Sequence, residues 1–241
     1  MKNSFDYSLM RRLEAAQKPW GRLWLNIHLA QQRLRAHWLA RGGGFLKRSL
    51  DIGLSLLFLI LLSPLFAVIA LAVWVEDGGP FVFAQTRVGQ NGRQFKMYKI
   101  RSMCPDADQR LKELLEKNQL KEGVTFKLKD DPRMTRVGKW LRKYSFDELP
   151  QLYNVLIGDM SLVGPRPPVP REVAMYRPAD RRRLAAKPGI TCVWQISGRS
   201  EIDFSGQVGL DVGYIESQSF WRDLKILVKT IPAVLSGRGA C

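Results

Sequence analysis

Two acidic residues stand side by side in the segment Ser145–Pro150, which reads SFDELP. Adjacent carboxylates such as Asp147 and Glu148 can share a divalent cation, or one can act as a nucleophile while the other positions the metal. A local structural role is the alternative, because Ser145 and Glu148 fit a helix capping box and acidic residues suit a helix N-terminus. Pro150 would then fall in the second turn and cost a hydrogen bond. If Pro150 begins the helix instead, both carboxylates precede it and can face a ligand together.

Basic side chains near this pair in the sequence have the chemistry of phosphate ligands. Taken singly, each of these residues is explained equally well as a solvated surface charge, so the hypothesis of phosphate binding depends on the whole set. Arginine can bind phosphate through two N–H groups, and Mg²⁺ is commonly held by one or two carboxylates together with substrate phosphates. The pattern predicts a Mg²⁺-dependent reaction on a phosphate-bearing substrate. The basic residues are Lys99, Arg101, Arg142, Lys143 and Arg166, the last of which lies between prolines.

The chain of 241 residues carries 38 Lys and Arg against 22 Asp and Glu, which gives a net charge of +16. Such a charge needs an anionic partner: nucleic acid, a membrane surface or a phosphorylated substrate. The hydrophobic fraction of 46% excludes a largely disordered basic tail. Three scattered cysteines fit neither a disulfide framework nor a zinc site, and no P-loop or GxGxxG motif occurs. No nucleic-acid-binding motif occurs either, so we expect no nucleic-acid partner.

An uncharged run of 24 residues extends from Ile52 to Val75. As a straight helix it would be about 36 Å long, enough to cross a hydrocarbon core of about 30 Å. It begins too far into the chain, and is too long, for a signal peptide. Ser63-Pro64 lies in its middle, and proline removes a backbone donor, so we expect a kink or a break there. A kinked helix that crosses the bilayer, and two half-helices that enter and leave on the same side, both remain open.

The segment before this run is basic and amphipathic. Its apolar residues recur every three or four positions, arginines flank them, and the glycines at 42–44 end the pattern. A basic helix with tryptophans on its apolar face suits the headgroup region of an anionic membrane. Packing against the folded domain or a second subunit is the alternative. The recurring residues are Trp20, Leu23, Trp24, Ile27, Ala30, Leu34 and Trp38.

The rest of the chain has the pattern of a soluble domain. Residues 80–103 alternate around Asn91-Gly92, which predicts a β-hairpin. The prolines of the segment 164–168 predict an extended backbone. Helical spacing predicts helices over 105–122, 137–144, 149–157, 171–186 and 219–235, and residues 124–129 and 191–198 have the pattern of strands.

Four stretches of the sequence resemble the bacterial sugar transferase family. These are monotopic polyprenyl-phosphate hexose-1-phosphate transferases that begin exopolysaccharide, O-antigen and glycoprotein glycan assembly. The resemblance covers roughly residues 45–240, and its motifs are long and specific. The stretches read KRSLDIGLSLLFLILLSPLF, FKMYKIRSM, KYSFDELPQLYNVLIGDMSLVGPRPPVP and KPGITCVWQISGRS.

The resemblance implies a transferase that moves a hexose 1-phosphate from a UDP-sugar to undecaprenyl phosphate and releases UMP, with Mg²⁺ as cofactor. In the family the aspartate of the pair, here Asp147, is the nucleophile that forms a phosphosugar-enzyme intermediate. The neighbouring Glu148 helps to hold the metal with it, and Arg166 matches an arginine that faces phosphate. Substrate-binding positions are implied in the same way for Lys99, Arg101, Ser102, Asp159 and Arg199.

Family members insert a re-entrant helix broken at Ser-Pro, which matches Ser63-Pro64 and favours re-entry over crossing. We therefore expect a monotopic membrane protein of α/β (α+β, helix-rich) fold, on the cytoplasmic face of the bacterial inner membrane. Its parts would be the extension 1–44, the re-entrant helix 45–78, and a catalytic domain 79–241 that ends in an interfacial amphipathic helix. Expected partners are the UDP-sugar, undecaprenyl phosphate and anionic lipids, and a homodimer remains open. The alternative is a non-catalytic membrane scaffold that binds lipid phosphate.

Overall fold

The computed structural model describes residues 44–107, 109–110, 131–198 and 202–236. The chain divides into a unit that ends at Lys47 and a compact unit that begins at Arg48, and the contacts described below lie in the second. The predicted extension 1–44, the strand predicted over 124–129 and Arg199 lie outside the described residues, as does most of the helix predicted over 105–122.

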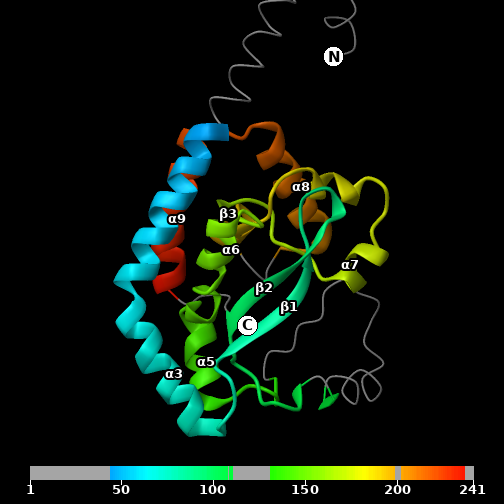
Figure 1. Ribbon diagram of the computed structural model, residues 1–241. Coiled ribbons are helices and arrows are strands. Elements are labelled where there is room, and N and C mark those ends of the chain that lie inside the picture. Colours follow the sequence, from blue (N-terminus) through cyan, green and yellow to red (C-terminus); the bar gives the residue numbers. More distant parts are fainter. Residues whose placement is uncertain (1–43, 108, 111–130, 199–201, 237–241) are drawn as a thin grey trace, which may run out of the picture. The chain divides into compact units, whose positions relative to one another are not determined.

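Pro64 divides the apolar run into two helices (Figure 1). The first spans Gly44–Leu61 and α3 spans Ser63–Asp77, with a bend of 59° between them. Pro64 has no N–H to continue the first helix, and the Ser63 hydroxyl donates to the Ile60 carbonyl at 2.8 Å. Among the described residues no single helix is long and apolar enough to cross a membrane, whereas this bent pair has the length and composition to do so. The break predicted at Ser63-Pro64 is confirmed.

Two polar side chains attach the first of these helices to the unit. The Arg48 guanidinium donates to two carbonyls in the last turn of α6 (Gln151–Ile157), at 2.6 and 2.7 Å. A cation at this position also interacts favourably with the negative end of the helix dipole. The buried Asp51 carboxylate accepts from the Ser161 hydroxyl at 3.1 Å and from the next backbone N–H at 2.9 Å. These bonds fix the helix without covering its outer apolar face.

The predicted β-hairpin is confirmed. Strands β1 (Val82–Val88) and β2 (Gln94–Ile100) pair antiparallel, and the turn between them places Asn91 at φ 55° and Gly92 at φ 82°. Asparagine and glycine are the residues that adopt this left-handed conformation most readily. Directly opposite residues share a face of a sheet, as do residues two apart along a strand. One face of the hairpin therefore carries Phe83 opposite Lys99, Gln85 opposite Met97, and Arg87 opposite Phe95.

The remaining elements include five helices, short 3-10 helices and a second pair of strands. The helices are α5 (Arg136–Lys143), α6, α7 (Pro170–Ala174), α8 (Phe204–Glu216) and α9 (Phe220–Leu235). Short 3-10 helices are η2 (Phe146–Glu148), η3 (Asp180–Ala185) and η4 (Trp194–Ile196). Strands β3 (Ser161–Val163) and β4 (Gly189–Thr191) pair in parallel. The helices predicted over 137–144, 149–157 and 219–235 are confirmed as α5, α6 and α9.

Other sequence predictions were wrong. The helix expected over 171–186 is interrupted at Pro178, which disfavours helical backbone at Arg177. The Asp180 carboxylate accepts from the Arg177 backbone N–H at 3.0 Å and starts a separate turn, η3. The strand expected over 191–198 ends at Thr191, because the chain turns into η4. Helix α8 was not predicted, since its glycines at 206, 209 and 213 weaken the helical signal.

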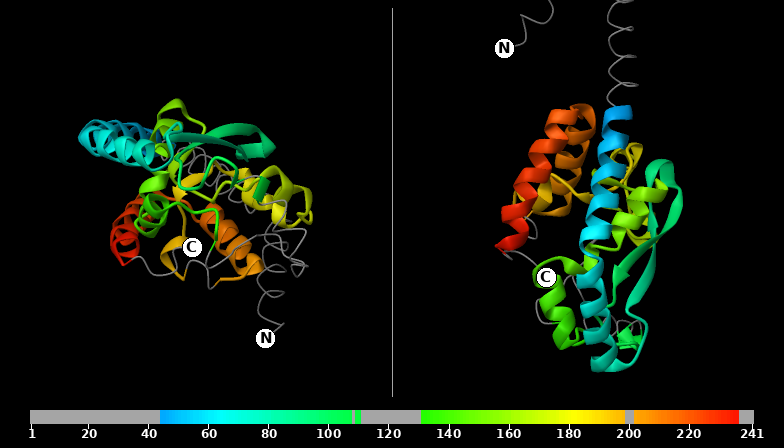
Figure 2. Two further views of the ribbon diagram at one scale, coloured as in Figure 1. Left: turned by 90° about the horizontal axis from the view of Figure 1, so that it is seen from below. Right: turned by 60° about the vertical axis from the view of Figure 1, so that its left-hand side comes forward.

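Two apolar clusters form the core, and β2 contributes to both. The larger includes Phe95 and Met97 of β2 together with residues of α6, β3, α8 and α9. The smaller joins Ile100 of β2 to Leu141 of α5 and to two residues of α3. In the right-hand view of Figure 2, α9 lies on one side of the broken helix and the hairpin on the other. The described residues thus form a helix-rich α+β fold, as predicted, in which Lys99 is carried by a strand fixed at both ends.

Candidate active site

The two adjacent carboxylates lie in η2, directly before helix α6. Ser145 adopts a left-handed backbone with φ 57°, and its side chain caps no helix. Helix α6 begins at Gln151, immediately after Pro150, so the helix does not contain Asp147 or Glu148. The capping-box alternative is therefore wrong, and the arrangement in which both carboxylates precede the helix is the one observed.

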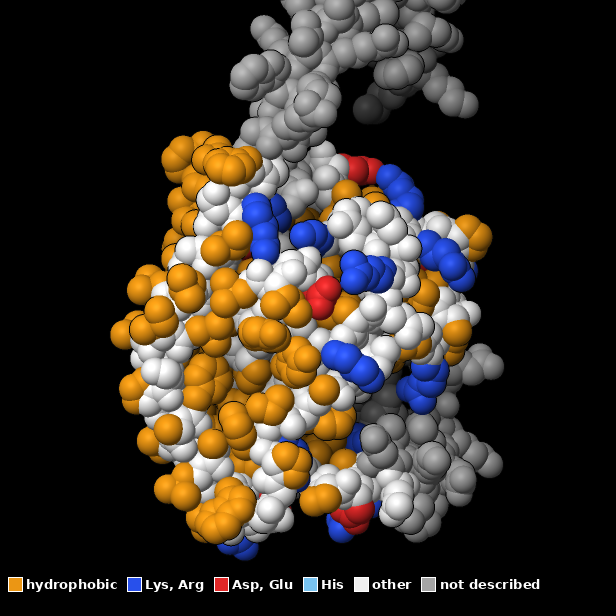
Figure 3. Space-filling model, viewed as in Figure 1, with side chains coloured by type: hydrophobic (Ala, Val, Ile, Leu, Met, Phe, Trp, Pro, Cys, Tyr) orange, Lys and Arg blue, Asp and Glu red, His pale blue; other side chains and the backbone are white. Residues whose placement is uncertain are grey.

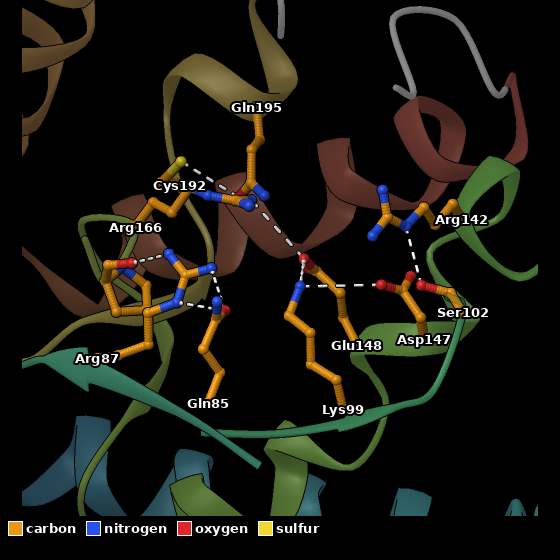
Figure 4. A network of polar contacts seen from close by, with 11 residues as sticks. Gln85, Arg87, Lys99, Ser102, Arg142, Asp147, Glu148, Arg166, Cys192 and Gln195 are labelled. Carbon is orange, nitrogen blue, oxygen red and sulfur yellow. Dashed lines mark hydrogen bonds and ion pairs between the residues drawn. The ribbon is translucent and has the colours of Figure 1, made fainter. Parts of the chain in front are cut away.

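Lys99 connects the two carboxylates (Figure 4). Its ammonium group lies 2.9 Å from Glu148 Oε1 and 3.8 Å from Asp147 Oδ2. All three side chains are largely enclosed, with exposed fractions of 16% for Lys99, 17% for Glu148 and 8% for Asp147. Because charges interact more strongly away from bulk water, this cation favours the ionised form of both acids.

The two carboxylates have opposite pKa shifts. Burial is the largest influence on Asp147 and raises its pKa, the negative charge of Glu148 adds to this rise, and Lys99 opposes it. Burial alone would also raise the pKa of Glu148. The cations of Lys99 and Arg166 and the Lys99 hydrogen bond outweigh burial there, and hold this pKa at about 2. At neutral pH Glu148 is therefore a permanent anion, while Asp147 is the more basic carboxylate and the better candidate nucleophile.

Arg166 faces Glu148 from the proline-rich loop. Its Nη1 lies 3.7 Å from Glu148 Oε1, and its guanidinium carbon is 6.0 Å from the centre of the Trp194 ring. The backbone of this loop is held to β4, since Gly164 N–H donates to the Thr191 carbonyl at 3.0 Å and Gly189 N–H donates to the Pro165 carbonyl at 2.9 Å. Arg166 is thus presented by a fixed backbone, and its half-exposed side chain can reach an incoming phosphate.

Ser102 positions a second arginine beside Asp147. The buried Ser102 hydroxyl accepts a hydrogen bond from Arg142 Nε at 2.9 Å. The Arg142 cation in turn favours the ionised form of Asp147. Helix α5 approaches Ser102 closely at Gly138, where an added Cβ would lie 2.1 Å from the Ser102 carbonyl oxygen. Ser102 therefore acts through Arg142.

Two predicted substrate-binding residues lie elsewhere. Arg101 follows Lys99 by two positions but forms an ion pair with Asp77 at the end of α3, and its guanidinium packs over Gly79. Asp159 lies beyond the C-terminus of α6, at the opposite end of that helix from Asp147. Neither residue contacts the carboxylate pair in this structure, and a substrate-binding role for Arg101 and Asp159 stays a prediction.

The sequence analysis missed Gln85 and Arg87, which complete the site. Arg87 is 9% exposed, and it donates to Gln85 Oε1 through Nε at 3.0 Å and Nη2 at 2.7 Å, and to the Pro167 carbonyl through Nη1 at 2.9 Å. The signal that could have found them is the hairpin register, which places both on the same face as Lys99. Together these elements border a small open hollow, lined by Arg87, Met97, Lys99, Glu148, Gln151, Arg166, Pro167, Gly189 and Ile190.

The donor set has the chemistry of a magnesium site that depends on its substrate. Among the described residues no group of three or more His, Cys, Asp or Glu side chains could hold a metal ion by itself. Mg²⁺ keeps several waters and is often bound by one or two carboxylates together with substrate phosphates. Asp147 and Glu148 supply two such carboxylates beside a hollow lined with cations, so the residues present fit this mode of binding.

Comparison with known proteins finds similar sequences in several bacteria. A family model described as bacterial sugar transferase matches residues 43–237. The galactosyl transferase CpsE of Streptococcus agalactiae is 53% identical over 195 residues, which cover 80% of this chain and 43% of that protein. The undecaprenyl-phosphate galactose phosphotransferase of Salmonella typhimurium is 44% identical, covering 86% of this chain and 44% of that protein. The exopolysaccharide production protein ExoY of Sinorhizobium fredii is 44% identical, covering 82% and 89%. The chain thus spans less than half the length of the first two relatives and most of the third.

Proposed function

The chain belongs to the bacterial sugar transferase family, and we propose that it transfers a hexose 1-phosphate from a UDP-sugar to undecaprenyl phosphate, with release of UMP. The names of two relatives support the acceptor and the pathway, since one is an undecaprenyl-phosphate galactose phosphotransferase and another an exopolysaccharide production protein. Galactose, which two relatives have in their names, is the first sugar to test.

The observation that carries the proposal is the division of roles between the two carboxylates. Glu148 is held ionised by Lys99 and Arg166, whereas burial makes Asp147 the more basic of the pair. Phosphoryl transfer depends mainly on positioning and charge neutralisation, which Lys99, Arg142 and Arg166 can supply around these acids. A nucleophile surrounded by fixed cations is what a reaction through a covalent phosphosugar intermediate requires.

The proposed reaction has two displacement steps. In the first, an oxygen of the Asp147 carboxylate attacks the phosphorus that carries the sugar, and the bond to the UMP oxygen breaks. UMP leaves with the bonding electron pair. In the second, a phosphate oxygen of undecaprenyl phosphate attacks the same phosphorus, the bond to Asp147 breaks, and the free carboxylate returns. The lipid product then contains a diphosphate, and the two substrates never need to occupy the site together.

Asp147 and Glu148 would hold Mg²⁺, which when bound would neutralise phosphate charge during transfer. Glu148 suits this role because its low pKa keeps it ionised throughout the physiological range. The Lys99 ammonium group lies beside both carboxylates and neutralises part of their mutual repulsion. Arg166, which lies 3.7 Å from the same Glu148 oxygen that Lys99 contacts, would bind phosphate of the donor.

The surface supports membrane attachment as part of the proposal. Figure 3 shows hydrophobic side chains gathered over the broken helix and its neighbours. Large apolar patches of this kind mark interaction surfaces. We place the bent pair Gly44–Leu61 and α3 in the cytoplasmic leaflet as a re-entrant element, and α5 and α9 at the interface, with the site facing the cytoplasm. The exposed residues include Phe45, Leu56, Leu57, Ile60, Leu61, Val68, Leu71, Trp74, Trp140, Trp221, Val228, Ile231 and Leu235.

The test is UMP release by the purified full-length chain in lipid nanodiscs with Mg²⁺. A panel of UDP-sugars would be supplied with and without undecaprenyl phosphate. Sustained UMP release from one donor, dependent on the acceptor, is the expected result and would also identify the sugar. A folded protein that binds the nanodiscs but releases no UMP from any donor would favour the scaffold alternative.

A further inference from the structure

Arg87 is a buried cation whose hydrogen bonds go to neutral groups. Its guanidinium group, a planar fork of N–H donors, is fixed by Gln85 on one side and by the Pro167 carbonyl on the other. Among the described residues no carboxylate lies within ion-pair distance of it. Burial, together with the positive charge of Arg166, lowers the pKa of Arg87 to about 10. The carboxylates of Glu172 and Glu148 partly oppose this fall from a greater distance, and Arg87 remains charged at neutral pH, so the fold places here a buried charge without a direct ion pair.

The hollow beside Arg87 has an excess of positive charge. Arg87, Lys99 and Arg166 line it together with one carboxylate, Glu148. Cations outnumber carboxylates even when Asp147, beside Lys99, is included. Buried charges are usually paired, because an unpaired charge loses its hydration without compensation. An anionic ligand in this hollow would supply the missing partner.

Arg87 also has donors to offer. A guanidinium carries five N–H groups, and the contacts with Gln85 and Pro167 occupy three of them. The two remaining N–H groups belong to different nitrogens, Nη1 and Nη2, which is the pair that binds a phosphate in bidentate fashion. Gln85 and Pro167 therefore fix the orientation of the guanidinium group and leave two of its N–H donors available to a ligand.

We propose that Arg87 is a substrate-binding residue that, together with Arg166, holds the two phosphates of a nucleoside diphosphate donor. The inference rests on the proposed function, since it assigns a place to the diphosphate of the UDP-sugar. Arg166 extends from the proline-rich loop toward Glu148, and Arg87 lies under the same loop, bonded to the residue after Arg166. One arginine is thus available to each phosphate, and a nucleotide with a single phosphate can use only one of them.

The test compares the binding of UDP and UMP by calorimetry, with the full-length chain in nanodiscs and Mg²⁺ present. The wild-type protein should bind UDP more tightly than UMP. Arg87→Met, which removes the charge and keeps much of the volume, should weaken UDP binding about tenfold more than UMP binding. Inorganic pyrophosphate should lose affinity in parallel with UDP, because it tests the phosphate contacts without the nucleoside.

Lys96→Met is the matched control. Lys96 lies on the same strand as Lys99 but on the opposite face, where it is exposed and donates to the Thr86 hydroxyl at 2.9 Å. Its replacement removes the same charge from the same hairpin outside the hollow, so the ratio of UDP to UMP affinity should not change. If Arg87→Met fails to fold in a thermal-unfolding assay, Arg87→Lys replaces it. Lysine keeps the charge but cannot form the fork, and it should reduce the ratio about threefold.

The outcomes separate this inference from the proposed function. A selective loss of UDP and pyrophosphate affinity supports the inference. An unchanged ratio, or an equal loss of UDP and UMP affinity, overturns the assignment of Arg87 and leaves the proposed reaction intact. If the wild-type protein binds neither UDP nor UMP, the proposed donor is wrong, and the inference is wrong with it.

Discussion

Replacing Lys99 with methionine should shift the pH dependence of the first displacement step, so that the rate falls at a higher pH on the acid side of the profile (the acid limb). Asp147 must be ionised to attack, and Lys99 is the cation that most favours its ionised form. The charges are 3.8 Å apart, so their attraction is about 4 kcal/mol at an effective dielectric constant of about 20 and about 1 kcal/mol in bulk water. Losing this attraction destabilises the ionised form by about 1 to 4 kcal/mol and so raises the pKa of Asp147 further. Since burial already raises the pKa of Asp147, the limb would move toward neutral pH.

The assay is single-turnover UMP release without the lipid acceptor, measured across pH. Omitting the acceptor matters because a phosphate monoester titrates near pH 6 and would obscure the aspartate. Lys99→Arg, which preserves the charge, should keep the limb near its wild-type position, and Lys96→Met on the opposite face of the same strand should not move it. An acid limb that stays in place in Lys99→Met would refute the conclusion that Lys99 favours the ionised form of Asp147.

Three further changes test separate parts of the account. Glu148→Gln removes the permanent anion of the pair, so the Mg²⁺ concentration that half-saturates UMP release should rise at least about tenfold; an unchanged requirement would contradict its role as a ligand. Arg48→Met removes two hydrogen bonds to the last turn of α6 and should lower the free energy of unfolding in detergent by about 2 kcal/mol, whereas a change within error would mean that solvent replaces them. Pro64→Ala restores a backbone donor at the break, so part of the protein population should have its N-terminal segment on the periplasmic side, where cysteine labelling would detect it. Periplasmic labelling of this segment in the wild-type protein would contradict re-entry.

Local sequence signals predicted the elements whose causes are local. Asn91-Gly92 supplies the left-handed residues of the hairpin turn, and Pro64 removes the donor that would continue the first helix. Ser219 accepts from the Arg222 backbone N–H at the start of α9. The predictions failed where a tertiary contact or a weak propensity decided the outcome. Helix α8 forms despite its glycines because it buries Val208 and Tyr214, and a single-sequence pattern does not contain that packing.

In the site too, the sequence predicted some residues, and tertiary contacts decided the position of others. Motif resemblance brought Lys99, Glu148 and Arg166 into one prediction, and in the structure both cations lie close to the same Glu148 oxygen, at 2.9 Å for Lys99 and 3.7 Å for Arg166. It also suggested Arg101, which lies two residues from Lys99 but is drawn away by Asp77 at the end of α3. Arg87 belongs to the site through its bond to the Pro167 carbonyl, 80 residues away in sequence. A contact over that distance follows from the path of the chain, although the hairpin register already places Arg87 on the correct face.

The covalent step through Asp147 is the central claim, and intact-protein mass spectrometry tests it most directly. The wild-type chain and Asp147→Asn would each be mixed with the UDP-sugar and Mg²⁺ without acceptor, and the modified peptide would then be identified. The account predicts a stoichiometric sugar-phosphate adduct on Asp147 with equivalent UMP release in the wild-type protein, and neither in Asp147→Asn. An adduct on Glu148, or transfer to undecaprenyl phosphate by Asp147→Asn at the wild-type rate, would contradict it.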